Sequence, residues 1–128
     1  MELNAITGAI VQSAIRVHSI LGPGLLESAY RACLRHDLTR RGLKVESEVA
    51  VPIVFDGLIL EVGYRMDLLV EDTVVVETKA IKKLTVVDEA QLLSHLKLGG
   101  KPAGLLINFH VYRLKDGIKR MLNGTVPG

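Results

Sequence analysis

The first two segments of the chain show the apolar spacing of amphipathic helices. From Glu2 to Leu21, one stripe is formed by Ile6, Ala9, Ile10, Ala14, Val17 and Leu21. Gly22-Pro23-Gly24 then interrupts the pattern. The next stripe is formed by Leu26, Ala29, Tyr30, Cys33, Leu34 and Leu38. It predicts a helix from about Leu25 to Arg41, which Gly42 would end. We expect Cys33 to be a small buried residue of this helix.

The pattern then changes to period two, which is typical of strands. Val45–Phe55 and Leu58–Val70 each alternate over their length, and Asp56-Gly57 between them is a strong hairpin signal. Pro52 cannot donate to a neighbouring strand, so the first strand is expected to lie at an edge or to contain a bulge. A third, very apolar strand is expected from Val74 to Ala80.

The remaining segments complete the prediction of an α/β fold. A helix is expected from about Val86 to Leu98, where Thr85 and Asp88 are spaced as a capping box. Ala103–Phe109 is expected to be a buried strand, and Leu114–Leu122 a turn or short helix. The predicted fold is a central mixed β-sheet, with three antiparallel strands plus a later strand, flanked by helices.

The turn before the third strand determines where its polar side chains point. Glu77 and Lys79 are two residues apart and therefore share one side of the strand. Burying this carboxylate and ammonium without partners would be costly. A three-residue turn at Glu71–Thr73 sets Asp67 opposite Glu77, whereas a two-residue turn would set Met66 there. We therefore predict the three-residue turn.

Pairing across the Asp56-Gly57 turn extends this polar patch. The same counting sets Glu46 opposite Asp67 and Glu48 opposite Arg65. Clustered carboxylates repel one another, and a hard cation such as Mg²⁺ or Mn²⁺ would compensate them. A water on such an ion can attack phosphorus beside a charge-stabilising lysine. A salt-bridge network on a solvated face is the alternative, and spacing alone leaves both open.

These residues resemble a known family pattern. Asp67, nine intervening residues and then Glu77-x-Lys79 resemble the PD-(D/E)XK nuclease superfamily. Gly24–Tyr30 is similar to the signature of the GxxExxY protein family, a bacterial and archaeal branch of that superfamily. Further segments similar to this family are Glu89–Leu93, Gly104–Phe109 and Leu114–Arg120. The resemblance covers nearly the whole chain and implies a restriction-endonuclease-like core.

The resemblance also implies roles for individual residues. Asp67 and Glu77 would be metal ligands for Mg²⁺ or Mn²⁺, and Lys79 would orient the attacking water and stabilise charge. Glu27 would be an accessory acid near the metal and a further ligand candidate. Gln91 would help to position the site. Without the resemblance, Glu27 and Gln91 would be interpreted as ordinary helix-surface residues.

The sequence departs from the family pattern at two positions. Met66 precedes Asp67, where the superfamily's name has proline. His95 stands four residues after Gln91, where related nucleases often have tyrosine, and the two share a helix face. A neutral histidine could still stack or form a hydrogen bond there. Tyr30 lies on an apolar stripe, so we expect it in the core.

The composition of the chain limits the kind of protein it can be and where it is expected in the cell. The chain has 128 residues, which fits one domain over residues 1–128. Its single cysteine excludes an internal disulfide and fits the cytoplasm. We find no signal peptide and no run long enough for a membrane span. The net charge of +2 only weakly supports a nucleic-acid partner.

The function predicted from these features is metal-dependent hydrolysis of nucleic-acid phosphodiester bonds, with DNA favoured over RNA. Aromatic residues make up only 4% of the chain, so phosphate contacts would dominate over base stacking. The alternatives are a nucleic-acid-binding module and an assembly module, each keeping the nuclease fold without its chemistry. A homodimer is a further expectation, because dimerisation could build a substrate groove.

Overall fold

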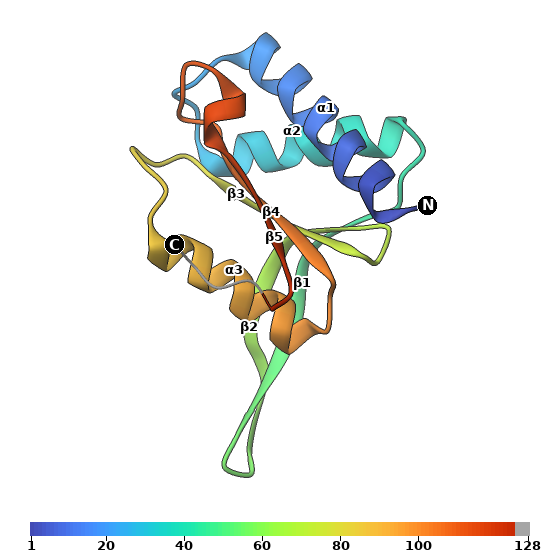
Figure 1. Ribbon diagram of the computed structural model, residues 1–128, viewed down its shortest axis with the longest axis vertical. Coiled ribbons are helices and arrows are strands. Elements are labelled where there is room, and N and C mark those ends of the chain that lie inside the picture. Colours follow the sequence, from blue (N-terminus) through green and yellow to red (C-terminus); the bar gives the residue numbers. More distant parts are fainter. Residues whose placement is uncertain (125–128) are drawn as a thin grey trace.

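The computed structural model describes residues 1–124, which form a five-stranded mixed sheet with helices on both faces (Figure 1). The last four residues of the predicted domain lie outside this range. The elements are α1 (Leu3–Leu21), α2 (Glu27–Arg40), β1 (Val45–Phe55), β2 (Leu58–Val70), β3 (Val74–Lys79), α3 (Val86–Gly99), β4 (Ala103–Asn108), the 3-10 helix η1 (Leu114–Gly117) and β5 (Ile118–Leu122). Strands lie in the order β1-β2-β3-β4-β5, with β3 and β4 parallel and the other pairs antiparallel. The predicted α/β class with a mixed, helix-flanked sheet is confirmed. Among residues 1–124, no helix combines the length and apolar character needed to cross a lipid bilayer.

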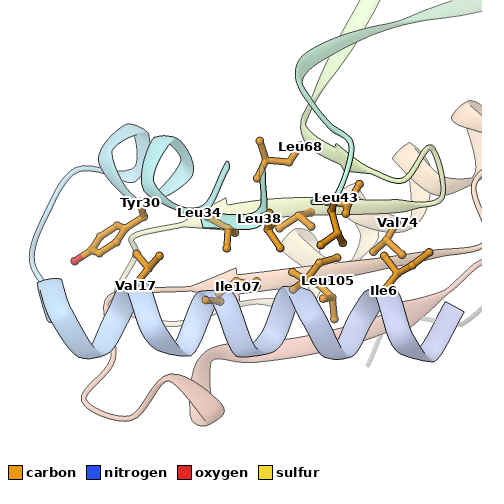
Figure 2. Close-up of a cluster of buried hydrophobic side chains, with 14 of the residues drawn as sticks. Ile6, Val17, Tyr30, Leu34, Leu38, Leu43, Leu68, Val74, Leu105 and Ile107 are labelled. Atoms are coloured by element: carbon orange, nitrogen blue, oxygen red, sulfur yellow. The ribbon is translucent and has the colours of Figure 1, made fainter. Parts of the chain in front are cut away.

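The face of the sheet covered by α1 and α2 carries the larger core (Figure 2). Its buried side chains include Ile6, Ile10 and Val17 from α1, Tyr30, Leu34 and Leu38 from α2, and Leu68, Val74, Leu105 and Ile107 from the strands. Removing each such side chain from water contributes about 1.5–3 kcal/mol. Burial on both sides explains why β3 and β4 are almost continuously apolar.

Tyr30 belongs to this core, as expected, and is fully buried. Its ring stacks on Phe109, with centroids 4.5 Å apart. The hydroxyl donates to the carbonyl oxygen of Gly22 at 2.5 Å and accepts from the backbone N–H of Leu25 at 3.1 Å. Tyr30 thereby holds the turn that leads into α2.

The expected burial of Cys33 is wrong, because its side chain is exposed. Leu26, at the start of the same predicted stripe, is 77% exposed. Asp37 is buried on α2 instead, where it accepts hydrogen bonds from Ser13 and Arg16 of α1. The inward face of α2 therefore includes a charged residue, which a search for apolar spacing passes over.

The opposite face of the sheet packs against α3 and forms a second core. Its buried residues are Val51, Met66, Leu69, Val75, Leu92, Leu96, Leu106 and Met121. The predicted capping box at the start of α3 is confirmed: the Thr85 hydroxyl accepts from the Asp88 N–H, and the Asp88 carboxylate accepts from the Thr85 N–H. This helix carries two residues of the candidate site described below.

The predicted three-residue turn between β2 and β3 is also confirmed. Val70 pairs with Val74 and Leu68 with Val76, as that turn requires. Glu71 has a φ of 52°, a value in the left-handed region. The faces of β3 therefore follow the expected alternation.

The predicted register of the β1–β2 hairpin is wrong in its inner half. Phe55 pairs with Leu58 as expected, but the register shifts between Val51 and Ile53. Pro52 lies at this shift, and it lacks the N–H that a regular ladder would use. As a consequence, Glu46 pairs with Leu69 and not with Asp67.

Glu48 is displaced by the same shift. It does not stand opposite Arg65, because Ala50 takes that position. Glu48 itself has a φ of 52°, an uncommon value for a residue other than glycine. Its side chain lies within ion-pair distance of Arg31 of α2, at 3.6 Å.

The tail differs from its prediction as well. Leu114–Leu122 contains the 3-10 helix η1 but continues into β5, an edge strand antiparallel to β4. The inward residues of β5, Ile118 and Met121, are three apart and give no period-two signal. Gly117 permits the turn into β5, because a Cβ there would lie 2.2 Å from the carbonyl oxygen of Asn108.

Candidate functional site

The candidate site begins where β2 and β3 separate. The paired residues of these strands end at Leu68 and Val76. Beyond them, Oδ2 of Asp67 accepts hydrogen bonds from the backbone N–H of Thr78 at 2.9 Å and from its hydroxyl at 3.1 Å. Thr78 is fully buried, so its N–H needs a partner within the protein. The carboxylate of Asp67 supplies that partner and is fixed between the two strands.

Glu77 lies on the α3 side of β3 and is only 5% exposed. Its Oε1 is 2.5 Å from Nδ1 of His95, which α3 presents to the strand. Burial raises the pKa of the Glu77 carboxyl above its usual value, the hydrogen bond from His95 lowers that pKa, and the charge of Asp67 raises it. Glu77 and Asp67 are thus close enough to repel each other.

His95 is itself held by an aromatic neighbour. Its ring stacks on that of Tyr64 with centroids 4.1 Å apart, and the Tyr64 hydroxyl donates to the His95 carbonyl oxygen at 3.0 Å. Burial and the nearby charge of Glu77 raise the pKa of Tyr64 to about 12. The histidine that departs from the family pattern therefore forms both the stack and the hydrogen bond considered for it.

Lys79 and Gln91 meet beside Glu77. Nζ of Lys79 donates to Oε1 of Gln91 at 3.2 Å. Gln91 lies one helical turn before His95, so the partners of Glu77 and Lys79 follow one another along α3 in the reverse order. This contact orients the ammonium group of Lys79 without neutralising it.

Glu27 is the first residue of α2 and approaches the same cluster from the other face of the sheet. Burial raises the pKa of its carboxyl, and the charge of Asp67 raises it further, whereas Lys79 and Arg31 lower it. These effects require short distances, so Glu27 lies within electrostatic reach of both Asp67 and Lys79.

Sequence reasoning missed Arg31. Its Nη1 lies 3.7 Å from Oδ1 of Asp67, and its Nη2 lies 3.6 Å from Oε1 of Glu48. Arg31 follows Glu27 by four residues, and this spacing was the available signal that it shares the Glu27 face of α2. Glu46, by contrast, pairs with Lys44 at 3.4 Å and does not join the cluster.

The donor chemistry of this cluster fits a hard divalent cation, because its three acidic side chains, Glu27, Asp67 and Glu77, carry only oxygen donors. Within residues 1–124, however, no group of three or more metal-ligating side chains is spaced to hold an ion. Asp67 is held by Thr78 and Arg31, and Glu77 by His95. The structure therefore contains a salt-bridge network around the carboxylates that sequence analysis considered as metal ligands.

Comparison with known proteins identifies the family of the chain. Neither the curated proteins nor the solved structures gave a match. A family model described as the PD-(D/E)XK nuclease superfamily matches residues 4–121. That range includes every helix and strand that contributes to the cluster. The chain belongs to the PD-(D/E)XK nuclease superfamily.

Proposed function

We propose that this protein is a metal-dependent nuclease that hydrolyses phosphodiester bonds, with DNA favoured over RNA as substrate. The observation that carries the proposal is the meeting of Asp67, Glu77 and Lys79 where β2 and β3 separate. Membership of the superfamily implies a nucleic-acid substrate. The arrangement supplies acidic ligands and an oriented ammonium group next to one another.

In this proposal Asp67 and Glu77 hold Mg²⁺ or Mn²⁺, with Glu27 as an accessory acid. A bound divalent ion supplies a more acidic water and offsets charge on phosphate oxygens. Lys79, oriented by Gln91, stabilises the negative charge that develops on the phosphate during attack. His95 is a positioning residue, because it fixes the carboxylate of Glu77 through one oxygen.

We also propose that the chain belongs to the GxxExxY branch. Support comes from the three positions that name the motif. Gly24 has a φ of 102°, a conformation that favours glycine. Tyr30 fixes the turn that contains it, and Glu27 stands between them facing Asp67. The motif thus links a core residue to an acid of the candidate site.

The test is cleavage of a labelled panel of single- and double-stranded DNA and RNA with Mg²⁺ or Mn²⁺. We expect wild-type protein to cleave DNA and Lys79→Ala to lose activity by about 100-fold or more. The matched control is Lys83→Ala, which removes an exposed lysine of the loop that follows β3. Circular dichroism checks that each variant is folded.

Equal activity of Lys79→Ala and wild type would overturn the role of Lys79. A second result would favour the binding module: nucleic-acid binding that survives both Asp67→Ala and EDTA, without any product. Calorimetry with Mn²⁺ tests the remaining alternative, an assembly module with a vestigial site, because such a module would bind no metal.

We further propose that a second copy of the chain covers the distal part of the β1–β2 hairpin, residues 53–62, called the arm here. The arm extends away from the rest of the protein (Figure 1). One of its faces carries Phe55, Leu58, Leu60 and Val62, which are 47–73% exposed. Together they offer several hundred Å², about the largest apolar patch of a typical monomer. Two such faces packed together fit a small, concentration-dependent interface.

A further inference from the structure

A polar groove runs between α2 and β1 beside the candidate site. It has a volume of about 510 Å³. Its polar side chains are Ser28, Arg31, Arg35, His36, Thr39 and Ser47. In the described part of the chain, the residues that line it include two arginines and three hydroxyl groups but no carboxylate and no tyrosine, tryptophan or phenylalanine. Such a lining suits an anionic chain that is recognised without base stacking.

Arg31 links the groove to the candidate site. This side chain lines the groove and also reaches Oδ1 of Asp67 at 3.7 Å. One lining residue of the groove therefore contacts a carboxylate that we propose as a metal ligand. A strand lying in it would enter the site from the α2 side.

Arg35 provides the positive charge of the groove that is available to bind a phosphate. It is exposed and, within residues 1–124, forms no salt bridge. Arg16 and Arg41 differ, because both pair with Asp37. Arg31 is already engaged by two carboxylates, so Arg35 is the arginine of the groove that is free to bind a phosphate.

We infer that this groove binds the sugar–phosphate backbone of the substrate strand next to the phosphate that is cleaved. The inference rests on the proposed function and adds the path of the substrate. Arg35 supplies the main ionic contact, and the hydroxyl groups of Ser28 and Ser47 supply neutral hydrogen bonds. Because these groups recognise phosphate and sugar, binding through them is independent of base sequence.

The test measures binding of fluorescein-labelled DNA duplexes of two unrelated sequences by anisotropy, as a function of KCl concentration. Lys79→Ala is the parent protein, so that cleavage does not interfere. Adding Arg35→Ala should weaken binding of both duplexes about threefold to tenfold and reduce the slope of log affinity against log salt by about one. Adding Arg40→Ala instead removes the same charge from an exposed position of α2 outside the groove.

An equal effect of Arg35→Ala and Arg40→Ala would overturn the inference while leaving the proposed function intact, because general charge would then explain binding. An effect of Arg35→Ala on only one of the two sequences would also contradict it. If the parent protein binds neither duplex nor the matching single-stranded DNA or RNA, the proposed function fails, and the groove inference fails with it.

Discussion

At the scale of single residues, Glu77 combines a buried carboxylate with a raised pKa. A folded-state pKa above the ordinary 4.5 stabilises the fold fully below pH 4.5, and this contribution is lost as the pH rises through the folded-state value. The ionised carboxylate therefore lowers stability at neutral pH. We predict that Glu77→Gln, which removes the charge and keeps an oxygen for His95, raises the free energy of unfolding at neutral pH by about 0.5–2 kcal/mol.

Urea denaturation in EDTA at neutral pH and below pH 4.5 measures this difference. The gain should shrink in acid, where wild-type Glu77 is protonated. Glu61→Gln serves as the control because Glu61 is exposed on the arm. A less stable Glu77→Gln at neutral pH would show that the contact of the ionised carboxylate with His95 outweighs the cost of burial.

Sequence separation was enough to predict that Asp67, Glu77 and Lys79 lie near one another, but the same counting wrongly added Glu46 to them. Period two set Glu77 and Lys79 on one side, and the length of the turn after β2 set Asp67 beside Glu77. Arg31 and Glu48 could not be found in this way. The predicted place of Glu48 along β2 was wrong because of a register shift whose size no local pattern states, since Pro52 indicates an irregularity but not how many residues it displaces.

At the scale of elements, a buried charge joins α1 to α2. Asp37 accepts from the Ser13 hydroxyl at 2.7 Å, and Arg16 and Arg41 pair with its two oxygens. The hydrogen bond from Ser13 lowers the pKa of Asp37 below 3.8, and both arginines lower it further. A depressed pKa contributes stability above pH 3.8 that is lost as the pH falls through the folded-state value.

We therefore predict that Asp37→Asn lowers the free energy of unfolding by about 1–3 kcal/mol at neutral pH. The difference from wild type should narrow below pH 3.8, where the wild-type carboxylate becomes protonated. Chemical denaturation at both pH values tests this, with exposed Asp116→Asn as the control. A loss that is the same at both pH values would point to packing and not to charge.

The helices α1 to α3 and the strands β1 to β4 were predicted from periodicity, but β5 and the inward face of α2 were not. β5 was missed because only two of its residues point inward, at a spacing of three. The inward face of α2 was misjudged because Asp37 is buried while Cys33 is not. In both cases tertiary partners, β4 for the strand and the α1 side chains for Asp37, decide the outcome.

At the scale of the whole molecule, the exposed apolar face of the arm leads us to expect self-association that depends on protein concentration. We predict that sedimentation velocity shows wild-type protein shifting from monomer to dimer as its concentration rises. Replacing two exposed apolar residues of one face, Phe55→Ser with Leu58→Ser, should leave a monomer at every concentration, because the face would lose much of its apolar area.

The control for this experiment is Ile15→Ser, which changes an exposed apolar residue of α1. Helix α1 lies far from the arm (Figure 1). The Ile15→Ser variant should dimerise like wild type. A wild-type monomer at high concentration would remove the dimer proposal. A dimer that persists in the double variant would locate the interface elsewhere on the molecule.

The parallel pairing of β3 with β4 has a consequence for synthesis. β4 leaves the ribosome after α3, so a nascent chain that ends with α3 already contains all five predicted site residues. It still lacks the strand that pairs with the whole length of β3 and the N–H of Phe109 that bonds the carbonyl oxygen of Lys79. An incomplete chain thus carries the reactive groups without the framework that aligns them. Under the proposed function, cleavage would begin only after β4 has joined the sheet.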